Sequence, residues 1–404
     1  MPDSRFDDIR PFNEAEFPGA MQRIVSDPLF PSIAAWLFPG RDPEVLRALM
    51  LSSRCANEFQ ARVMRDVVQA ILDKSCTGFN WSGLSDLSRS ERYLFVSNHR
   101  DIMMDAAIQQ YLFVNEGFET AEITFGANLM SPGLVTDIGR ANKMFRTERP
   151  GVGGVSPREL WEALRHLSDY IRYAICEKRQ SVWIAQRGGR TKDGVDVTDP
   201  AVLKMFLMSS SLDPVDALCE LHLAPMAVSY EWEPCDVLKV LELYASSRSV
   251  YVKNPGEDLN SILTGITQPK GRIHMAFCAP LTPADLEAFR GLSASVFCRE
   301  VAALIDRRIR SAYRLFPNNY IAADLLSGGS AYAAFYTAAE QRAFLDSMNR
   351  LDALCASGRV PYEALDELRD RYLHLYAGPV SEISAINFPP KSRKPVKFID
   401  ERLA

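Results

Sequence analysis

The sequence predicts an α/β protein in which a mixed, largely parallel central sheet is flanked by helices, with helical additions at both ends. Two observations lead to this prediction. Between residues 86 and about 285, short apolar runs of strand length alternate with longer segments whose apolar residues recur at helical spacing. Outside that region the helical spacing dominates. A length of 404 residues suffices for one large domain with additions, or for two domains.

Three regions follow from these patterns. Residues 1–85 are expected to form a helical N-terminal region, with the clearest helices at residues 43–50 and 58–72. Residues 86–330 are expected to form the α/β domain, and residues 331–404 a helical C-terminal extension. The expected strands are residues 93–98, 121–126, 144–147, 181–186, 224–232 and 272–278. The later expected helices are residues 284–313 and 338–355, separated by turn-rich segments at 317–319 and 327–330.

The helix that follows Gly154 has the clearest beginning in the chain. Ser156 is a good N-cap, Pro157 suits the first helical position, and Glu159 follows Ser156 by three residues. Apolar side chains then form one stripe, which indicates core packing: Leu160, Leu164, Leu167, Ile171 and Ile175.

Composition narrows the class of protein. A hydrophobic content of 47% with a charged content of 24% is that of an ordinary globular protein. The net charge of −5 argues against a nucleic-acid binder, which usually has a basic surplus. Eight cysteines without Cys-x-x-Cys spacing suit reduced core residues of a cytoplasmic protein. The acidic, polar start indicates no signal peptide, and no run approaches a membrane span.

The strand expected at residues 93–98 brings Asn98 and His99 to its carboxyl end, where α/β folds place ligands. Asp101 and Asp105 follow within two turns. A His beside a carboxylate can take a proton from a hydroxyl, because the carboxylate fixes the tautomer and stabilises the imidazolium. In the alternative interpretation, Asn98 and His99 only cap the next helix. The chain has five histidines, too scattered for a three-His metal site, so no metal is expected.

Basic residues form a second candidate group. Four of them gather between residues 140 and 149, with Glu148 as the only acid: Arg140, Lys143, Arg146 and Arg149. An exposed helix face could have the same composition. Beside a His-Asp pair and the turn at Gly188, Gly189 and Arg190, a phosphate-binding site is the favoured interpretation.

Four segments, in order, resemble the motif blocks of the glycerol-phosphate and 1-acylglycerol-3-phosphate acyltransferase superfamily. Residues 93–105 are similar to the first block, Asn-His followed after four residues by Asp, here with five intervening residues. Residues 139–146 resemble the second block. Residues 181–191 resemble the third, normally Phe-Pro-Glu-Gly-Thr-Arg-Ser, but lack its Glu. Residues 223–230 resemble the fourth, an apolar strand with a Pro, and the resemblance covers roughly residues 86–285.

The resemblance implies a glycerolipid acyltransferase fold and an O-acyltransferase of phospholipid biosynthesis. A fatty acyl group would move from an acyl thioester, acyl-coenzyme A or acyl-carrier protein, to a hydroxyl of a glycerol-phosphate-type or lysophospholipid acceptor. His99 would be the general base, with Asp105 favoured over Asp101 as its partner. The implied substrate-binding residues are Asn98, Arg100, Arg140, Lys143, Arg146, Gly188, Gly189 and Arg190. The thioester is a co-substrate, and no further cofactor is expected.

The expected location is the cytoplasm, with peripheral binding at the inner face of the membrane. Residues 28–39, with three prolines and Trp36, are an anchor candidate in which Phe30, Leu37 and Phe38 would also insert. A short helix covering the core would have the same pattern. The basic tail at residues 391–397 would attract anionic lipid. Two alternatives stay open: an acyl-thioester or phosphate-ester hydrolase, and a catalytically silent lipid-binding protein.

Overall fold

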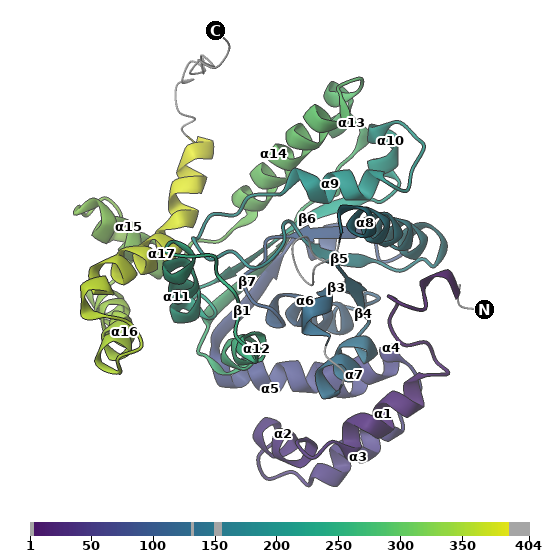
Figure 1. Cartoon of the computed structure of the whole chain (residues 1–404), viewed down its shortest axis with the longest axis horizontal. Coiled ribbons are helices and arrows are strands. Elements are labelled where there is room, and N and C mark those ends of the chain that lie inside the picture. The colour runs from purple at the N-terminus through teal and green to yellow at the C-terminus, as the bar shows by residue number, and fades with distance from the viewer. Residues whose placement is uncertain (1–3, 131–132, 149–155, 388–404) are drawn as a thin grey trace.

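A computed structural model describes residues 4–130, 133–148 and 156–387. At its centre lies a seven-stranded sheet with the order β1-β7-β6-β2-β5-β3-β4 (Figure 1). All neighbouring strands are parallel except β6 and β7, which are antiparallel. The predicted fold class, a mixed and largely parallel sheet flanked by helices, is therefore confirmed. The strands are β1 (Cys76–Ser82), β2 (Leu94–Ser97), β3 (Glu122–Gly126), β4 (Met144–Thr147), β5 (Val182–Ala185), β6 (Leu223–Tyr230) and β7 (Gly271–Phe277).

Helices cover both faces of the sheet (Figure 1). On one face, α8 (Pro157–Arg172), α9 (Pro200–Leu207) and α14 (Ala294–Ala312) contribute to the largest apolar core. On the other face, α5 (Arg65–Ser75) and α6 (Met104–Asn115) contribute to a second core. The predicted capping box at the start of α8 is present.

Strand β2 lies in the middle of the sheet and is buried on both faces. Leu94 and Val96 belong to the first core, whereas Phe95 belongs to the second. A strand covered on both sides reads as a continuous apolar run, so the sequence marks it clearly. Because β5 and β6 both run parallel to β2, the carboxyl ends of all three strands meet at one edge of the sheet.

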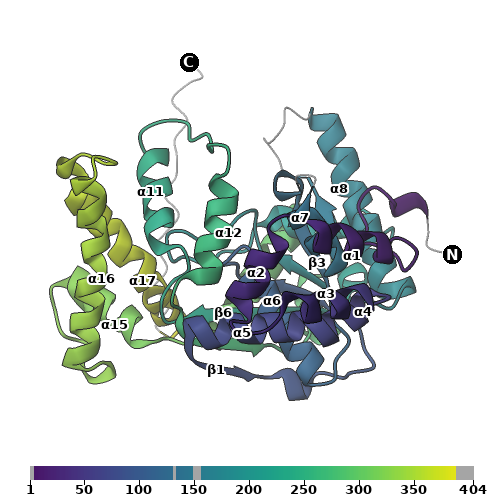
Figure 2. The same ribbon diagram turned by 90° about the horizontal axis from the view of Figure 1, so that it is seen from below.

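Two smaller helical cores flank the sheet (Figure 2). The N-terminal core contains α1 (Phe17–Ser26), α2 (Phe30–Leu37), α3 (Pro43–Leu51), α4 (Ala56–Phe59) and α7 (Leu134–Ala141). The C-terminal core contains α11 (Asp236–Ser246), α15 (Pro317–Ser327), α16 (Ala338–Ala356) and α17 (Leu365–Asn387). The other described α-helices are α10 (Pro214–Cys219), α12 (Glu257–Thr267) and α13 (Pro283–Leu286). None of the helices in the described ranges is long and apolar enough to cross a membrane.

The structure contains all six expected strands, with ends that shift by at most two residues, and adds β1. The region up to residue 85, expected to be helical, thus also contains a strand, β1, which pairs with β7. The apolar pattern does not predict this strand, because β1 lies at the edge of the sheet and its side chains are mostly polar or exposed.

Helix boundaries at the C-terminal end also differ from the prediction. The expected turn at residues 317–319 is the first turn of α15, whose Pro317 occupies a first-turn position that needs no N–H donor. The expected helix at 284–313 is interrupted before α14. α15 packs with α16 and α17, although it precedes the C-terminal extension expected from residue 331.

Candidate active site

His99 and Asp105 form a hydrogen-bonded pair just beyond the carboxyl end of β2. Nδ1 of His99 lies 2.9 Å from Oδ2 of Asp105. Asp105 is fully buried and 9% of His99 is exposed. Because the carboxylate engages Nδ1, Nε2 is the ring nitrogen left to act on a substrate. The ring of Trp183, on β5, meets the imidazole edge-on at 5.6 Å between centroids.

Asp105 is held in place by three further donors. Its Oδ2 accepts hydrogen bonds from the backbone N–H groups of Arg100 (2.7 Å) and Asp101 (3.0 Å). Its Oδ1 accepts one from the hydroxyl of Tyr230, at 2.7 Å. These hydrogen bonds engage both oxygens of the carboxylate. The geometry therefore fixes the carboxylate beside the imidazole.

Asp101 has a different task. Its Oδ1 accepts hydrogen bonds from the backbone N–H groups of Met103 (2.9 Å) and Met104 (2.8 Å), where α6 begins. This is the bonding of a helix-capping side chain. Of the two candidate partners of His99, the hydrogen-bonded one is Asp105.

Asn98 is occupied by structural hydrogen bonds. Its side-chain amide donates to Asp196 and to the carbonyl of Val228, both at 3.0 Å, and its oxygen accepts from the Val228 N–H at 2.8 Å. The side chain is fully buried and ties β2 to β6. It is therefore not available to a substrate, in contrast to the expectation from the sequence.

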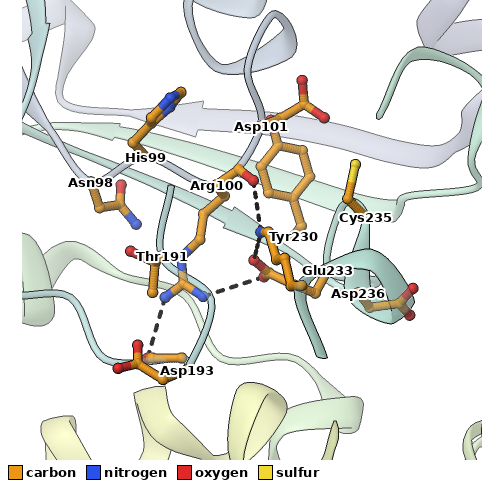
Figure 3. A network of polar contacts seen from close by, with 12 residues as sticks. Asn98, His99, Arg100, Asp101, Thr191, Asp193, Tyr230, Glu233, Cys235 and Asp236 are labelled. Atoms are coloured by element: carbon orange, nitrogen blue, oxygen red, sulfur yellow. Dashed lines mark hydrogen bonds and ion pairs between the residues drawn. The ribbon is translucent and has the colours of Figure 1, made fainter. Parts of the chain in front are cut away.

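Arg100 points away from His99 and Asp101, into a buried network of charges (Figure 3). Its guanidinium contacts Asp196 at 2.6 Å and Glu233 at 3.3 Å. Lys239 donates to Glu233 and to the carbonyl oxygen of Arg100. Burial opposes the charge of Arg100, but the two carboxylates outweigh it and raise its pKa. With no exposed surface, Arg100 is part of the scaffold and not a substrate ligand, which corrects the prediction.

The loop after β5 lies against His99. The backbone N–H of Thr191 donates to the carbonyl of His99 at 2.8 Å, and the Thr191 hydroxyl donates to Asp196 at 2.6 Å. Gly189 has a φ of +81°, which favours glycine, and the space beside the α-carbons of Gly188 and Gly189 is open within the described structure. The predicted Gly-Gly-Arg turn thus borders the His-Asp pair.

Arg190 follows this turn and is 8% exposed. Its Nη1 and the Oδ2 of Asp101 are both buried without a hydrogen-bond partner among the described residues. Burial raises the pKa of the Cys235 thiol to about 11. The charge of Asp101 also raises this pKa, whereas Arg190 lowers it. One of these two unmatched polar atoms thus belongs to the segment that carries His99, and the other to the turn after β5.

The predicted basic segment does not assemble at His99. Lys143 precedes β4, at the opposite edge of the sheet, and donates to the carbonyl of Thr120 (3.2 Å) and to Gln180 (2.9 Å). Burial lowers its pKa to about 8. Lys143 cannot reach a ligand at His99, so this prediction is wrong.

Arg140 and Arg146 of the segment are also engaged. Arg140 lies over the ring of Phe12 and donates to the carbonyl of Arg10, so it too serves packing. Arg146, near the carboxyl end of β4, is half exposed and pairs with Glu148 at 2.6 Å. Arg149 lies outside the described residues. Of the three described members of this group, Arg146 is the one placed where an extended ligand could meet it.

A mostly apolar cavity runs along one side of α6. Its lining includes Met103, Ala107, Tyr111 and Val114, which recur at helical spacing from the His99 end of α6 to its far end. Side chains of α5, α7 and the strands complete the wall, among them Met64, Val68, Ile123, Ile138 and Met144.

Sequence reasoning missed four residues that hold this site: Asp196, Tyr230, Glu233 and Lys239. The available signal was weak. Tyr230 ends a buried strand, where a polar group is unusual, but Asp196 and Glu233 lie in segments without a motif. No group of three or more His, Cys, Asp or Glu side chains within the described ranges is arranged to hold a metal ion.

Fold and site together define an α/β protein with a buried His-Asp pair at the carboxyl end of a central strand. No protein-family model and no curated protein matches the chain. Among solved structures, the chain is similar to the 1-acyl-sn-glycerophosphate (LPA) acyltransferase PlsC from Thermotoga maritima. The identity is 11% and the TM-score 0.35, over 73% of this chain and 95% of that chain. This is a distant likeness, and the reaction of that enzyme is not carried over from it.

Proposed function

We propose that this protein is an O-acyltransferase that moves a fatty acyl group from an acyl thioester to a hydroxyl of a glycerol-phosphate-type or lysophospholipid acceptor. The observation that carries the proposal is the His99–Asp105 pair, with Nε2 unengaged by the carboxylate. The helix that follows His99, α6, also lines the apolar cavity. Acyl transfer to a hydroxyl requires a proton acceptor.

The proposed reaction needs no acyl-enzyme intermediate. Nε2 of His99 takes the proton of the acceptor hydroxyl while its oxygen attacks the thioester carbonyl carbon. The tetrahedral intermediate then collapses and the carbon–sulfur bond breaks. The imidazolium gives its proton to the leaving sulfur, so a thiol is released and His99 is neutral again. Asp105 stabilises the imidazolium between these two steps. Backbone N–H groups of the turn at Gly188 and Gly189 are candidate donors to the oxyanion, since the space beside them is open.

The acyl chain of the donor would occupy the cavity along α6. Its lining spans Met103 to Val114, which corresponds to about 16 Å of helix at 1.5 Å per residue. Three of the lining residues are methionines, whose flexible side chains adapt to an alkyl chain: Met64, Met103 and Met144.

For the acceptor we propose Arg190 as the main phosphate ligand. Its guanidinium has an unmatched N–H next to the His99 segment, and guanidinium groups bind phosphate oxygens in a bidentate way. Arg146 would add attraction at the rim. The acceptor phosphate would thereby hold the hydroxyl near Nε2.

Peripheral binding to the inner face of the membrane, in the cytoplasm, remains our proposal for where the reaction occurs. Phe30 and Leu37, expected to insert, are buried instead. Leu29, Ile33 and Trp36 are at least 39% exposed and recur on one side of α2, so they are now the candidates for insertion. Residues 391–397 lie outside the described part of the chain.

The test is a thiol-release assay with long-chain acyl-coenzyme A and acyl-carrier protein, each with and without glycerol 3-phosphate or lysophosphatidate. Release that depends on an acceptor, with acylated acceptor as product, supports the transferase. Release without an acceptor would make the protein a thioester hydrolase. Binding of the donor without release would make it a lipid-binding protein. His99→Ala should lose about two to four decades of rate, whereas His374→Ala, at an exposed site on α17, should not.

A further inference from the structure

The two oxygens of Asp105 serve different partners. Oδ2 faces His99 and two backbone N–H groups, whereas Oδ1 accepts a hydrogen bond, 2.7 Å long, from the hydroxyl of Tyr230. Tyr230 is the last residue of β6 and is 1% exposed. Its hydroxyl therefore contacts the side of the carboxylate that faces away from the imidazole.

We infer that Tyr230 is a positioning residue which holds the Asp105 carboxylate toward His99 and withdraws part of its negative charge through Oδ1. The inference rests on the proposed role of His99 as a base. A base must be unprotonated before it can act. An anion close to an imidazole stabilises the protonated ring, and a hydrogen bond to that anion weakens the effect. Tyr230 would thus keep His99 available as a proton acceptor.

Tyr230 is suited to donate at all working pH values. Burial, followed by the charges of Asp105 and Asp101, raises its pKa well above the ordinary value. The phenol consequently stays protonated. Its rigid ring at the end of a central strand also leaves the hydroxyl little freedom to turn away.

The other charged or titratable groups near Tyr230 and Asp105 do not donate a hydrogen bond to Oδ1 of Asp105 among the described contacts. From the first position of β1, Cys76 acts on Tyr230, and burial raises the pKa of its thiol. From the end of α14, Tyr313 faces Asp105, and burial raises its pKa as well. Before β7, Lys270 lies near Asp101, and burial lowers its pKa. Arg100 is neutralised by the buried carboxylates Asp196 and Glu233.

A matched control exists on another part of the sheet. The hydroxyl of Tyr170 donates to Oε2 of Glu122 at 2.5 Å, and both side chains are 1% exposed. Glu122 begins β3, so this pair lies at the edge of the sheet opposite His99. Tyr170→Phe removes the same chemical group from the same kind of carboxylate.

The experiment is a titration of the histidine rings by NMR in protein labelled with ¹⁵N-histidine. The chain has five histidines, and the signal of His99 is identified by its loss in His99→Ala. In Tyr230→Phe the titration midpoint of His99 should move to higher pH by more than about 0.3 unit, a twofold change in protonation. The acid limb of the pH–rate profile should also move to higher pH, while the KM of the acceptor stays constant. Tyr170→Phe should leave both unchanged.

An unchanged or lower midpoint in Tyr230→Phe, or an equal rise in Tyr170→Phe, would overturn the inference. If Tyr230→Phe does not fold, 3-fluorotyrosine at position 230 gives the reverse test, because a stronger donor should move the midpoint to lower pH. The titration needs no enzymatic activity. It therefore separates failure of this inference from failure of the proposed function.

Discussion

Nη2 of Arg100 lies 2.6 Å from Oδ2 of Asp196, and both side chains are buried. The contact joins the segment that carries His99 to the loop after β5. Glu233 and Lys239 complete a set of two positive and two negative charges with almost no exposure to water. Such a set stabilises a fold only when it is complete, because a single buried charge without a partner is costly.

Removal of one member should therefore destabilise the protein strongly. Arg100→Met leaves Asp196 without its cation, and we expect the free energy of unfolding to fall by about 3–5 kcal/mol. Urea unfolding measures this. As a control, Arg248→Met breaks an exposed ion pair with Glu367 and should cost at most about 1 kcal/mol. Similar losses in both variants would contradict the role of the buried network.

The same network predicts a pH dependence of stability. Burial raises the pKa of Asp196, but Arg100 and hydrogen bonds from Thr191 and Asn98 outweigh it, so the pKa is lowered overall. A lowered pKa gives stability that is present above the unfolded value, about 4, and is lost as pH falls further. In Arg100→Met only the hydrogen bonds from Thr191 and Asn98 still oppose the effect of burial, so protonation of Asp196 becomes more favourable. The stability difference between wild type and Arg100→Met should therefore shrink from pH 7 to pH 4; a constant difference would argue against this assignment.

The two acidic residues after His99 should respond differently to amide substitution. Asp105→Asn removes the charge that stabilises the imidazolium, so we expect acyl transfer to fall by about two to four decades. Asp101→Asn keeps the oxygen that accepts from Met103 and Met104, so its rate should stay close to wild type. Steady-state kinetics on both purified variants decides this, and the reverse order would make Asp101 the partner.

Narrowing of the cavity should change the preferred acyl chain. Ala107→Leu places a larger side chain one turn beyond Met103, so long donors would lose the burial of their last carbons. The loss of two methylenes, at about 0.8 kcal/mol each, corresponds to roughly a tenfold lower kcat/KM for long chains. Short donors should be unaffected. Ala339→Leu, at an exposed position of α16, should change kcat/KM for neither long nor short donors. Equal loss for all chain lengths would place the acyl chain elsewhere.

The proposed phosphate ligand should act on one substrate only. Arg190→Ala should raise the KM of a phosphorylated acceptor by about 10- to 100-fold and leave the donor KM unchanged. Arg190→Lys should also be impaired, because an ammonium cannot form a bidentate contact. Arg146→Ala should have a smaller effect, since Arg146 is half exposed and already paired with Glu148. If Arg190→Ala raises both KM values equally, the residue has a structural role.

Buried strands and the His-Asp pair were predictable because both depend on residues close together in the chain. β2 is a continuous apolar run, and His99 and Asp105 are six positions apart. By contrast, the role of Arg100 depends on Asp196 and Glu233, which only the folded sheet brings near. Lys143 shows the same limit, since its basic neighbours in sequence say nothing about which edge of the sheet it occupies.

The pairing of β1 with β7 has a consequence for how the chain acquires its structure. Phe79 pairs with Ile273, nearly half the length of the chain later, and β2 likewise needs β5 and β6 as neighbours. During synthesis, the N-terminal segments must wait until these distant partners have emerged. Contacts of such long range slow folding and leave strand edges unpaired in the meantime. The half-made protein is therefore the stage most exposed to aggregation, and the stage at which chaperones have the most to protect.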